Sequence, residues 1–372
     1  TSAHALDYDD VALGGHPSTV LVPAVLAAAE AADASGARAI EAYLVGYETW
    51  AELASREPDP YHEKGWHPTA VLGTVAAAAA VCRLRGLPAD ASLRALGVAA
   101  SMASGLVANF GSMTKPLHAG RAAACAIDAV DLASDGLTSS ADALGSATGY
   151  LAALSPRGRA ERGPPVMRLG SRLRIREAGL SVKRYPVCYS SHRAIDGVLA
   201  IVAAHRIVEG EIREIRVTIG PTAAAMLHNH APATALEARF SLEFAVACAA
   251  VAGNVGLREL DDARVADPRV RRLMAAVRID IADTRCPIEP VFAYTDRVVV
   301  TLRDGRELDS GEIRFPRGNA RLPMSDEELA VKFTDCATGI DRGLADRLLD
   351  SLGRLEALPS VRTLPMPAAA VR

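Results

Sequence analysis

The chain has 372 residues, of which 50% are hydrophobic, 23% are charged and only 4% are aromatic. This composition is ordinary for a folded globular protein and excludes a disordered chain. Lys and Arg together number 41 and Asp and Glu 44, which gives a net charge of -3. A dedicated nucleic-acid-binding protein is usually basic, so this charge argues against that class of protein. The apolar run 70–82 is too short to cross a membrane, and the longer run 95–114 carries serines that favour a buried segment.

No cofactor or metal motif is visible. The six cysteines stand at least 38 residues apart, so no pair has the spacing of a metal site or a redox motif, and we expect reduced, mostly buried thiols of a cytoplasmic protein. The nine histidines form no HExxH arrangement, and glycine-rich phosphate loops are absent. We therefore expect neither metal nor nucleotide chemistry.

The first part of the chain is predicted to be a helical domain. Alanine- and leucine-rich stretches of helical length alternate with Gly, Pro and Ser breakers, and few charges fall within them. Such helices are expected to bury most of their surface against one another. The predicted helices cover residues 20–34, 37–56, 70–85, 91–106 and 120–134.

Residues 155–176 break this pattern with seven arginines and a Pro-Pro pair. A solvated linker is the favoured interpretation, and an anion-attracting rim of a cleft is the alternative.

The following region alternates as strands do. Strands are predicted over 212–219 and 277–281, and an Asp-Gly turn at 304–305 predicts a hairpin between 298–302 and 307–313. Helices are predicted over 194–205 and 236–252, and a helical tail over 325–358 opens with a capping-box pattern. The predicted fold is mainly α with an α+β part. A helical domain is formed by both chain ends (1–179 and 324–372), and an α+β lid domain (180–323) is inserted.

A His-Pro-Ser/Thr pattern occurs twice, at His16 and at His67, each time before an apolar helix. Proline suits a first helical turn, and the next hydroxyl can satisfy free amides there. Each histidine would then be held in a loop and could face a cleft. The alternative is a capping or packing residue, and the repeated context makes the two interpretations about equal.

A second pattern is Thr114-Lys115-Pro116, followed by His118 and an alanine-rich helix. The proline restricts Lys115 to an extended conformation. Cation, hydroxyl and helix amides together suggest a carboxylate site. A solvent-facing lysine is the alternative, and spacing alone favours it.

Two more groups carry reactive side chains. Residues 182–193 crowd cations, tyrosines, serines, Cys188 and His192 into one loop, but a Cys-His nucleophile pair is disfavoured because no orienting acid is visible. Asp7, Asp9 and Asp10 lie close to His4 and His16 in sequence. A solvated turn is the ordinary interpretation, and a buried carboxylate that orients His16 is the alternative.

Five motifs occur in order: residues 3–10 (AHALDYDD), 15–18 (GHPS), 66–69 (WHPT), 114–120 (TKPLHAG) and 183–186 (KRYP). With them the sequence resembles the MmgE/PrpD family, which includes 2-methylcitrate dehydratase, cis-aconitate decarboxylase and iminodisuccinate epimerase. The resemblance runs through the whole chain. It implies a helical domain with an α+β lid, a homodimer without metal or organic cofactor, and an active site between the domains. The pocket residues it implies are Asp7, His16, His67, Lys115 and Lys183.

Two departures bear on the reaction. Decarboxylase members carry a histidine where this chain has Cys188 and a tyrosine where Phe244 aligns, which counts against cis-aconitate decarboxylation. Members also carry about eighty helical residues before the first motif, so we expect a chain truncated at its N-terminus.

The sequence-based hypothesis is a lyase that dehydrates or hydrates a small hydroxylated di- or tricarboxylate resembling 2-methylcitrate. His67 would be the base or acid, Lys115 and Lys183 would neutralise carboxylates, and Asp7 and His16 would position one another. The alternatives are an epimerase, isomerase or decarboxylase of a similar polycarboxylate, and a non-catalytic carboxylate-binding homologue. The expected substrate-binding residues are Thr114, His118, Arg184, Tyr185, Cys188 and His192.

Overall fold

The computed structural model describes residues 1–165, 170, 172–289 and 292–367. Part of the arginine-rich segment 155–176, residues 166–169 and 171, lies outside the described residues. The chain forms two compact units. The first unit comprises Thr1–Ala5, Asp9–Leu180 and Ala337–Arg372, and the second comprises Leu6–Tyr8 and Ser181–Cys336.

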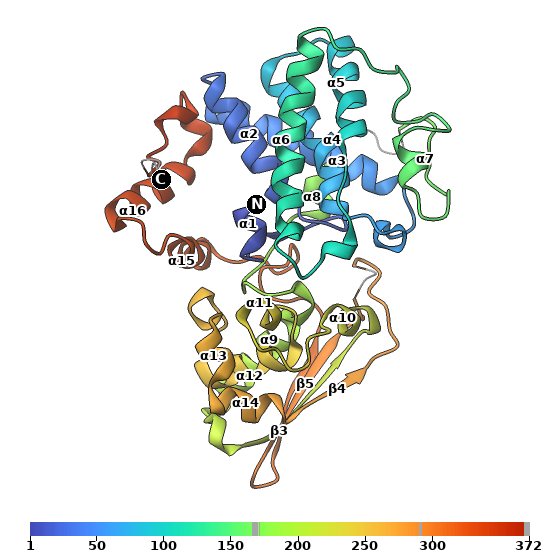
Figure 1. The fold of residues 1–372 in the computed structure, drawn as a ribbon. Coiled ribbons are helices and arrows are strands. Elements are labelled where there is room, and N and C mark those ends of the chain that lie inside the picture. Colours follow the sequence, from blue (N-terminus) through green and yellow to red (C-terminus); the bar gives the residue numbers. More distant parts are fainter. Residues whose placement is uncertain (166–169, 171, 290–291, 368–372) are drawn as a thin grey trace. The chain divides into compact units, whose positions relative to one another are not determined.

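The first unit is helical (Figure 1). Its longer helices lie where the alternation of apolar stretches and breakers predicts them. Its elements are α1 (Ser2–Ala5), β1 (Asp10–Val11), α2 (Ser18–Ala31), α3 (Gly36–Ser55), η1 (Tyr61–Lys64), α4 (Pro68–Arg85), α5 (Ala89–Met102), η2 (Val107–Asn109), α6 (Thr114–Ser134), α7 (Tyr150–Leu154), α8 (Arg174–Ala178), α16 (Arg342–Leu352), η6 (Leu355–Ala357) and η7 (Val361–Thr363).

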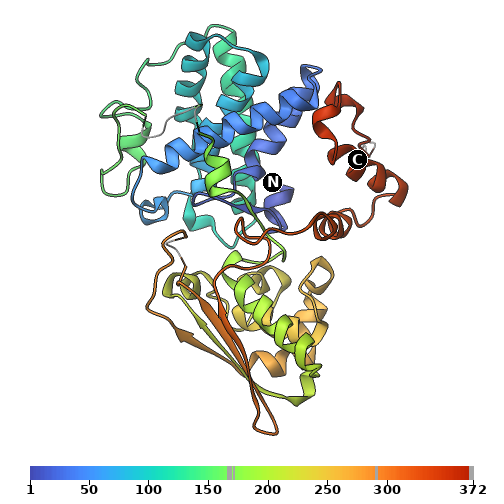
Figure 2. The same ribbon diagram turned by 180° about the vertical axis from the view of Figure 1, so that it is seen from behind.

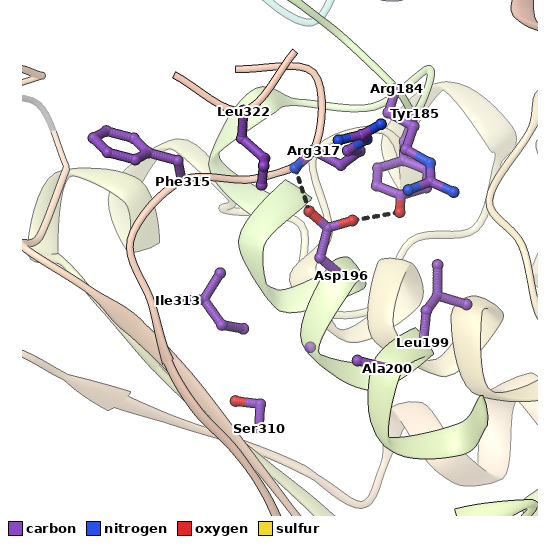
Figure 3. Close-up of a pocket in the computed structure, with 11 residues that line it drawn as sticks. Arg184, Tyr185, Asp196, Leu199, Ala200, Ser310, Ile313, Phe315, Arg317 and Leu322 are labelled. Atoms are coloured by element: carbon purple, nitrogen blue, oxygen red, sulfur yellow. Dashed lines mark hydrogen bonds between the residues drawn. The ribbon is translucent and has the colours of Figure 1, made fainter. Parts of the chain in front are cut away.

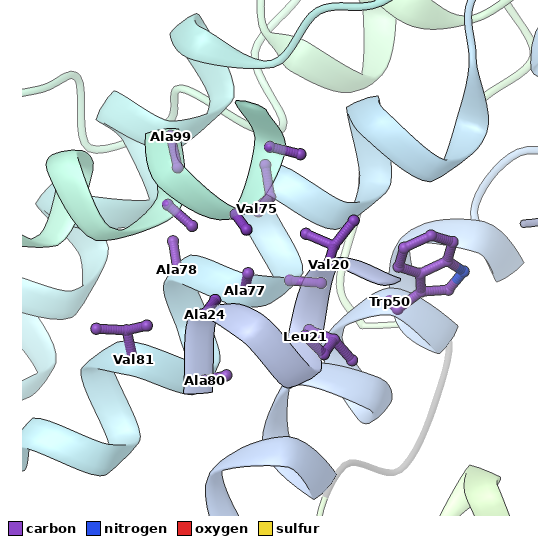
Figure 4. Packing of buried hydrophobic residues seen from close by; sticks show 14 of the residues in the cluster. Val20, Leu21, Ala24, Trp50, Val75, Ala77, Ala78, Ala80, Val81 and Ala99 are labelled. Carbon is purple, nitrogen blue, oxygen red and sulfur yellow. The ribbon is translucent and has the colours of Figure 1, made fainter. Parts of the chain in front are cut away.

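Helix α4 is the centre of this unit. It is apolar on all sides and almost wholly buried, and it packs against α2, α3, α5 and α6. Its alanines let the neighbouring helices approach closely, and Figure 4 shows Val20 and Ala24 of α2 beside Val75 and Ala77 of α4. The segment that carries His67 is therefore joined to a helix that is fixed by burial on all sides.

The second unit is a mixed sheet covered by helices. Its elements are β2 (Ser181–Val182), η3 (Tyr189–Ser191), α9 (His192–His205), η4 (Glu209–Glu211), β3 (Ile212–Ile219), α10 (Pro221–Met226), α11 (Ala235–Ala238), α12 (Leu242–Ala252), η5 (Leu257–Glu259), α13 (Asp262–Ala266), α14 (Pro268–Met274), β4 (Val277–Ile281), β5 (Asp296–Leu302), β6 (Glu307–Ile313) and α15 (Asp326–Cys336).

The strand order is β4-β3-β5-β6, with β3 and β4 parallel and the other pairs antiparallel. Helix α9 packs on β5 and β6, and α12 packs on α9 (Figure 2). Alternate residues of β3, such as Ile215, Val217 and Ile219, are fully buried, as the period of a strand requires. The predicted strands and the Asp-Gly hairpin are confirmed, and the chain is mainly helical with a mixed four-stranded sheet.

Most predicted helices differ from the observed ones by a few residues at their ends, and two cases have an identifiable cause. The single helix predicted over 236–252 is two helices, because Ser241 accepts a hydrogen bond from the Phe244 amide (3.2 Å) and begins α12. Helix α6 begins at Thr114 instead of residue 120. The capping box before α15 is confirmed, since the Ser325 hydroxyl accepts from the Glu328 amide and Glu328 accepts from the Ser325 amide.

Five cysteines are buried and Cys336 is exposed. This pattern agrees with the expectation of mostly buried thiols. Among the described residues, no helix has both the length and the apolar composition that crossing a bilayer demands.

Candidate active site

His16 and His67 each precede a helix of the first unit. His67 is the N-cap residue of α4, and Pro68 occupies the first turn as predicted. The expected capping by the following hydroxyls is wrong: Ser18 bonds to the Tyr43 hydroxyl (2.9 Å), and Thr69 Oγ1 has no partner in the described chain. A side chain inside the first turn is poorly placed to reach the amides there, whereas one before the helix can do so. The Asp10 carboxylate accepts from the Ser18 amide instead (3.2 and 3.3 Å).

A glycine holds the His67 segment in place. The His67 amide donates to the Gly105 carbonyl (3.0 Å). Gly105 has φ +141°, and a Cβ there would lie 2.9 Å from Ala70 Cβ and 3.3 Å from His118 Cγ. Only glycine combines this backbone conformation with this close approach.

Four histidines of the first unit form an imidazole cluster: His4, His16, His67 and His118. The Nδ1 atoms of His67 and His118 are 3.1 Å apart, so one ring donates a hydrogen bond and the other accepts it. The ring centroid of His4 lies 4.8 Å from that of His16 and 5.5 Å from that of His67. Phe110 meets the His67 ring edge-on at 4.8 Å, and Lys115 Nζ lies 5.5 Å from the Phe110 ring centroid.

Burial and positive neighbours keep His67 neutral. Its side chain is 2% exposed, and this burial lowers its pKa far below the usual range. His4, His16, Lys115 and His118 lower the pKa further by charge repulsion. Burial also lowers the pKa of His118, with a smaller contribution from Lys115. A neutral imidazole beside an ammonium group can accept a proton while the cation stabilises developing negative charge.

Asp9 lies between two members of the cluster. Its Oδ2 is 2.6 Å from His4 Nδ1, and its Oδ1 is 3.4 Å from His16 Nδ1. His16 Nδ1 also lies 2.6 Å from the Asp10 carbonyl oxygen. The sequence interpretation paired His16 with Asp7, whereas the carboxylate beside its ring in this unit is that of Asp9.

Among the described residues, His4, Asp9 and His16 form the one group of three side chains whose spacing could suit a metal ion. One ligand atom from each of His4, Asp9 and His16 lies within 4.8 Å of the others. His4 Nδ1 is hydrogen-bonded to the Asp9 carboxylate, and His16 Nδ1 is hydrogen-bonded to the Asp10 carbonyl. A cation bound at these nitrogens would displace both hydrogen bonds.

Lys115 lies inside α6, so the predicted extended conformation is wrong. Pro116 is the third helical residue, where a missing amide hydrogen costs no helical hydrogen bond. The amide that follows, that of Leu117, donates to the Met113 carbonyl (3.4 Å). The expected free amides after Pro116 are therefore engaged, and Lys115 itself, with half-buried Thr114 beside it, supplies the positive charge.

Lys183 and Asp7 form a buried ion pair in the second unit. Lys183 Nζ donates to Asp7 Oδ1 (2.7 Å), and the two side chains are 1% and 6% exposed. Asp7 has φ +52°, an unusual conformation for a residue other than glycine. Lys332 of α15 donates to the carbonyl oxygens of Lys183 (2.6 Å) and Tyr8 (2.7 Å). Lys332 thus links the backbone of Lys183 to the backbone of Tyr8, the residue after Asp7, and this link supports the ion pair.

Cys188 and His192 are fully buried near this pair. Burial raises the pKa of the Cys188 thiol, and Asp7 raises it further. Burial lowers the pKa of His192 to about 3. Its Nε2 donates to the Val187 carbonyl (3.3 Å), and its Nδ1 has no partner within the described chain. Because a protonated thiol is a poor nucleophile, the geometry gives no support to a Cys-His nucleophile pair.

Arg184 and Tyr185 line a cavity of about 460 Å³ in the second unit (Figure 3). The Tyr185 hydroxyl donates to Asp196 Oδ1 (2.6 Å), and Asp196 Oδ2 accepts from the Arg317 amide (2.6 Å). Arg184 lies 3.6 Å from Glu328, which also pairs with Arg317. Three polar residues of this lining, Tyr185, Asp196 and Arg317, are joined by hydrogen bonds, and the remaining lining is mostly apolar.

The sequence interpretation missed several supporting residues. Phe110 and Gly105 carry no chemical signal, and Lys332 lies in a helix 149 residues after Lys183. From the sequence alone, His4 is only a neighbour of the acidic run. The position of His4 before a run of three acids is the one signal that could have identified its contact with Asp9.

Comparisons with known proteins agree with these motifs. Residues 1–162 match the MmgE/PrpD N-terminal domain, and residues 185–349 match the MmgE/PrpD C-terminal domain. The chain is 30% identical to cis-aconitate decarboxylase of Homo sapiens over 89% of this chain and 69% of that protein. It is 27% identical to cis-aconitate decarboxylase of Mus musculus over 98% of this chain and 75% of that protein. A shorter match, 36% identical over 115 residues, is to cis-aconitate decarboxylase of Aspergillus terreus. The chain belongs to the MmgE/PrpD family.

Proposed function

We propose that this protein is a lyase that removes CO2 from a small tricarboxylate of the cis-aconitate type. The observation that carries the proposal is the hydrogen-bonded pair of buried His67 and half-buried His118 beside Lys115, which joins neutral imidazoles to a cation. The names of the curated relatives support the substrate class. On the strength of the family resemblance, the proposal extends to Asp7, His16 and Lys183.

The proposed chemistry balances without a redox step. When CO2 leaves, the electron pair of the broken C–C bond spreads through the adjacent double bond toward a remaining carboxylate. The ammonium group of Lys115 stabilises this charge, as a fixed cation does in a site of low polarity. A protonated group of the imidazole cluster then gives a proton to carbon, and the electron pair forms the new C–H bond. One proton from solvent is consumed per CO2 released.

A second candidate is dehydration of a hydroxylated tricarboxylate resembling 2-methylcitrate. One observation favours it: His67 is neutral and therefore suited to remove a proton. The family resemblance adds a second reason, because it implies a histidine in the decarboxylases where this chain has Cys188. In this reaction His67 takes the proton beside a carboxylate, and the C–O bond breaks. The hydroxyl then leaves as water with a proton from another group.

Product analysis separates these functions. The purified protein is incubated with cis-aconitate, 2-methylcitrate and related hydroxy acids, and each mixture is followed by NMR spectroscopy and CO2 detection. Release of CO2 from cis-aconitate supports the proposal, whereas an alkene formed without CO2 supports dehydration. Inversion of configuration alone indicates an epimerase. Binding without turnover of any compound indicates a non-catalytic homologue and contradicts both candidates.

A further inference from the structure

We propose that His118 is a positioning residue that acts through His67, and that the two rings form a relay which carries a proton between solvent and the reacting carbon while both rings stay neutral. The inference rests on the proposed function, because it assigns the path of the proton in the lyase reaction. It concerns residues of the first unit alone. His67 meets the reacting atoms in this assignment, and His118 meets only His67 and solvent.

The first step is the hydrogen bond between the two rings. The Nδ1 atoms of His67 and His118 lie 3.1 Å apart, and in a neutral imidazole one nitrogen donates and the other accepts. One hydrogen therefore lies between the rings, and the pair has two forms. In one form the hydrogen belongs to His67, whose Nε2 is then a bare acceptor. In the other form it belongs to His118, and His67 carries its own hydrogen at Nε2.

The second step is the charge of the rings. His67 is only 2% exposed and His118 is half-buried. Burial is the largest cause that lowers the pKa of each ring, and Lys115 lowers both further by charge repulsion. An imidazolium at His67 is therefore much less favourable than one in water. A proton that moves by exchange between the two neutral forms of the pair avoids this penalty.

The third step is the assignment of the two ends of the relay. In the part of the chain that the structure describes, neither His67 Nε2 nor His118 Nε2 has a hydrogen-bond partner, and neither atom is among the fully enclosed ones. His118 keeps the larger exposed surface of the two residues. Its Nε2 is therefore the end that exchanges protons with solvent, and Nε2 of His67 is the end that meets the substrate.

The fourth step is the proton balance of the decarboxylation. The electron pair left on carbon takes the Nε2 hydrogen of His67 and forms the new C–H bond. His67 Nδ1 takes the hydrogen of His118 Nδ1, and His118 Nε2 takes a proton from solvent. Each ring gains one proton and loses one, so each remains neutral, and a buried neutral imidazole can act as the acid toward enolate-like charge.

The relay returns to its first form after the product has left. Water that enters the site gives a proton to His67 Nε2, the shared hydrogen passes back to His118, and His118 Nε2 releases a proton to solvent. The net consumption is one solvent proton per CO2 released. The same steps in the opposite order remove a proton from carbon, as the dehydration candidate requires.

The backbone holds the two rings at a fixed separation. His67 begins α4, His118 lies near the start of α6, and these two helices pack against each other. Gly105 supports both rings: its carbonyl accepts from the His67 amide (3.0 Å), and a Cβ there would lie 3.3 Å from His118 Nδ1. The short distance between the Nδ1 atoms therefore depends on packed helices and on one glycine.

The variants His118→Asn and His118→Ala separate a relay from simple orientation of His67. Asparagine places an amide near the position of Nδ1 and can bond to His67, but it cannot take up a proton at one atom and release one from another. We expect both variants to lower kcat about a hundredfold or more and to leave KM largely unchanged, because His118 does not contact the substrate. Imidazole added to His118→Ala should restore part of kcat.

His62→Asn is the matched control and should keep the activity of the unmodified protein. In the described chain, His62 contacts the Phe110 ring at 6.0 Å between centroids and makes no hydrogen bond to either ring of the relay. Near-full activity of His118→Asn would mean that the hydrogen bond only orients His67, and it would overturn the relay. A change confined to KM would place His118 against the substrate and would overturn it as well.

Histidine-selective 15N NMR of the ligand-free protein supplies a measurement that needs no substrate. We expect a scalar coupling between the Nδ1 nuclei of His67 and His118 across their hydrogen bond, neutral-ring chemical shifts for both at pH 7, and loss of the coupling in His118→Ala. A missing coupling, or imidazolium shifts for His67 at pH 7, overturns the inference. If the coupling and the neutral rings are found but no compound is turned over, the proposed function fails and the neutral hydrogen-bonded pair stands.

Discussion

The His67 imidazole is neutral because it is buried and because its neighbours are cations or other imidazoles. Neutrality makes the ring an acceptor at pH values where an exposed histidine would be partly protonated. The hydrogen bond to His118 fixes its orientation, and the bond from its amide to Gly105 fixes its backbone. The role proposed for His67 therefore depends on its surroundings as much as on the residue type.

Replacing His67 by glutamine tests this role. Glutamine keeps a polar side chain but can neither accept a proton nor pass one on within the imidazole cluster, so we expect kcat to fall by about two to four powers of ten. Circular dichroism and the thermal unfolding midpoint should show that the fold is retained. His205→Gln, an exposed histidine at the end of α9, is the matched control and should keep full activity. Near-normal rates in His67→Gln would remove this residue from the mechanism.

The Asp7–Lys183 pair is a second test at the scale of single residues. Lys183→Met leaves the Asp7 charge buried without its ammonium partner, and we expect a loss of about 3–5 kcal/mol in the free energy of unfolding. The double variant Asp7→Asn/Lys183→Met removes both charges and should recover most of that loss, as urea unfolding can measure. If the double variant is as unstable as the single one, the packing of Lys183 and not its charge pairing explains the effect.

His192 predicts a pH dependence of stability. Its folded-state pKa is about 3, below the ordinary value of about 6.5, so the unfolded chain binds a proton that the folded chain excludes. This contribution to stability is complete above pH 6.5 and declines as the pH falls toward 3. Between pH 7 and pH 5 it amounts to about 2 kcal/mol.

His192→Phe should lack this decline, because phenylalanine has no proton to gain. Urea unfolding at pH 7 and pH 5 measures the difference between the variant and the unmodified protein at each pH. The prediction is wrong if both proteins lose the same stability on acidification.

At the scale of elements, the proposed reactive groups of the first unit lie in loops just before helices or in a first helical turn. His16 precedes α2, His67 begins α4 and Lys115 lies in the first turn of α6. The helices themselves are fixed by burial, with α4 packed on four neighbours. A loop anchored in this way can hold a side chain in position without being stable on its own.

Gly105→Ala tests the loop that supports His67. The added Cβ meets Ala70 and His118 in a backbone conformation that alanine rarely adopts, so we expect lower stability and at least about a tenfold loss of kcat. Gly111→Ala is the control, because Gly111 also has positive φ (+85°) but a Cβ there meets nothing within 4 Å. It should cost about 1 kcal/mol of stability and little activity. Equal effects of the two variants would mean that backbone strain alone matters.

The elements could be predicted from sequence where the pattern is long and periodic. The apolar helices and the β5–β6 hairpin follow from composition and from the Asp304-Gly305 turn. The start of α6 could not be predicted, because a residue before a proline, here Lys115, usually avoids the helical conformation, although proline is tolerated in a first helical turn. Nor could the break at Ser241, where a local side-chain cap divides one apolar stretch into two helices.

At the scale of the whole molecule, the candidate site could be predicted only in part. The residues named from the motifs are found in two groups, one around His67 in the first unit and one around Lys183 in the second. The partners of these residues could not be predicted, because Gly105, Phe110 and Lys332 have no sequence feature that marks a contact with a distant residue. Asp9 and His4 could be named as candidates but not paired, since three acids close in sequence offer several equivalent pairings.

The central claim is that imidazoles of the first unit move a proton between solvent and a carbon beside a carboxylate. Turnover of cis-aconitate or a related polycarboxylate in deuterated water, followed by NMR analysis of product and recovered substrate, tests it directly. We predict one deuterium per product molecule, bound to carbon next to or conjugated with a carboxylate, and no such product with His67→Gln. The account is contradicted if the product forms at the full rate but carries no deuterium on carbon, and the recovered substrate has exchanged none of its carbon-bound hydrogens for deuterium.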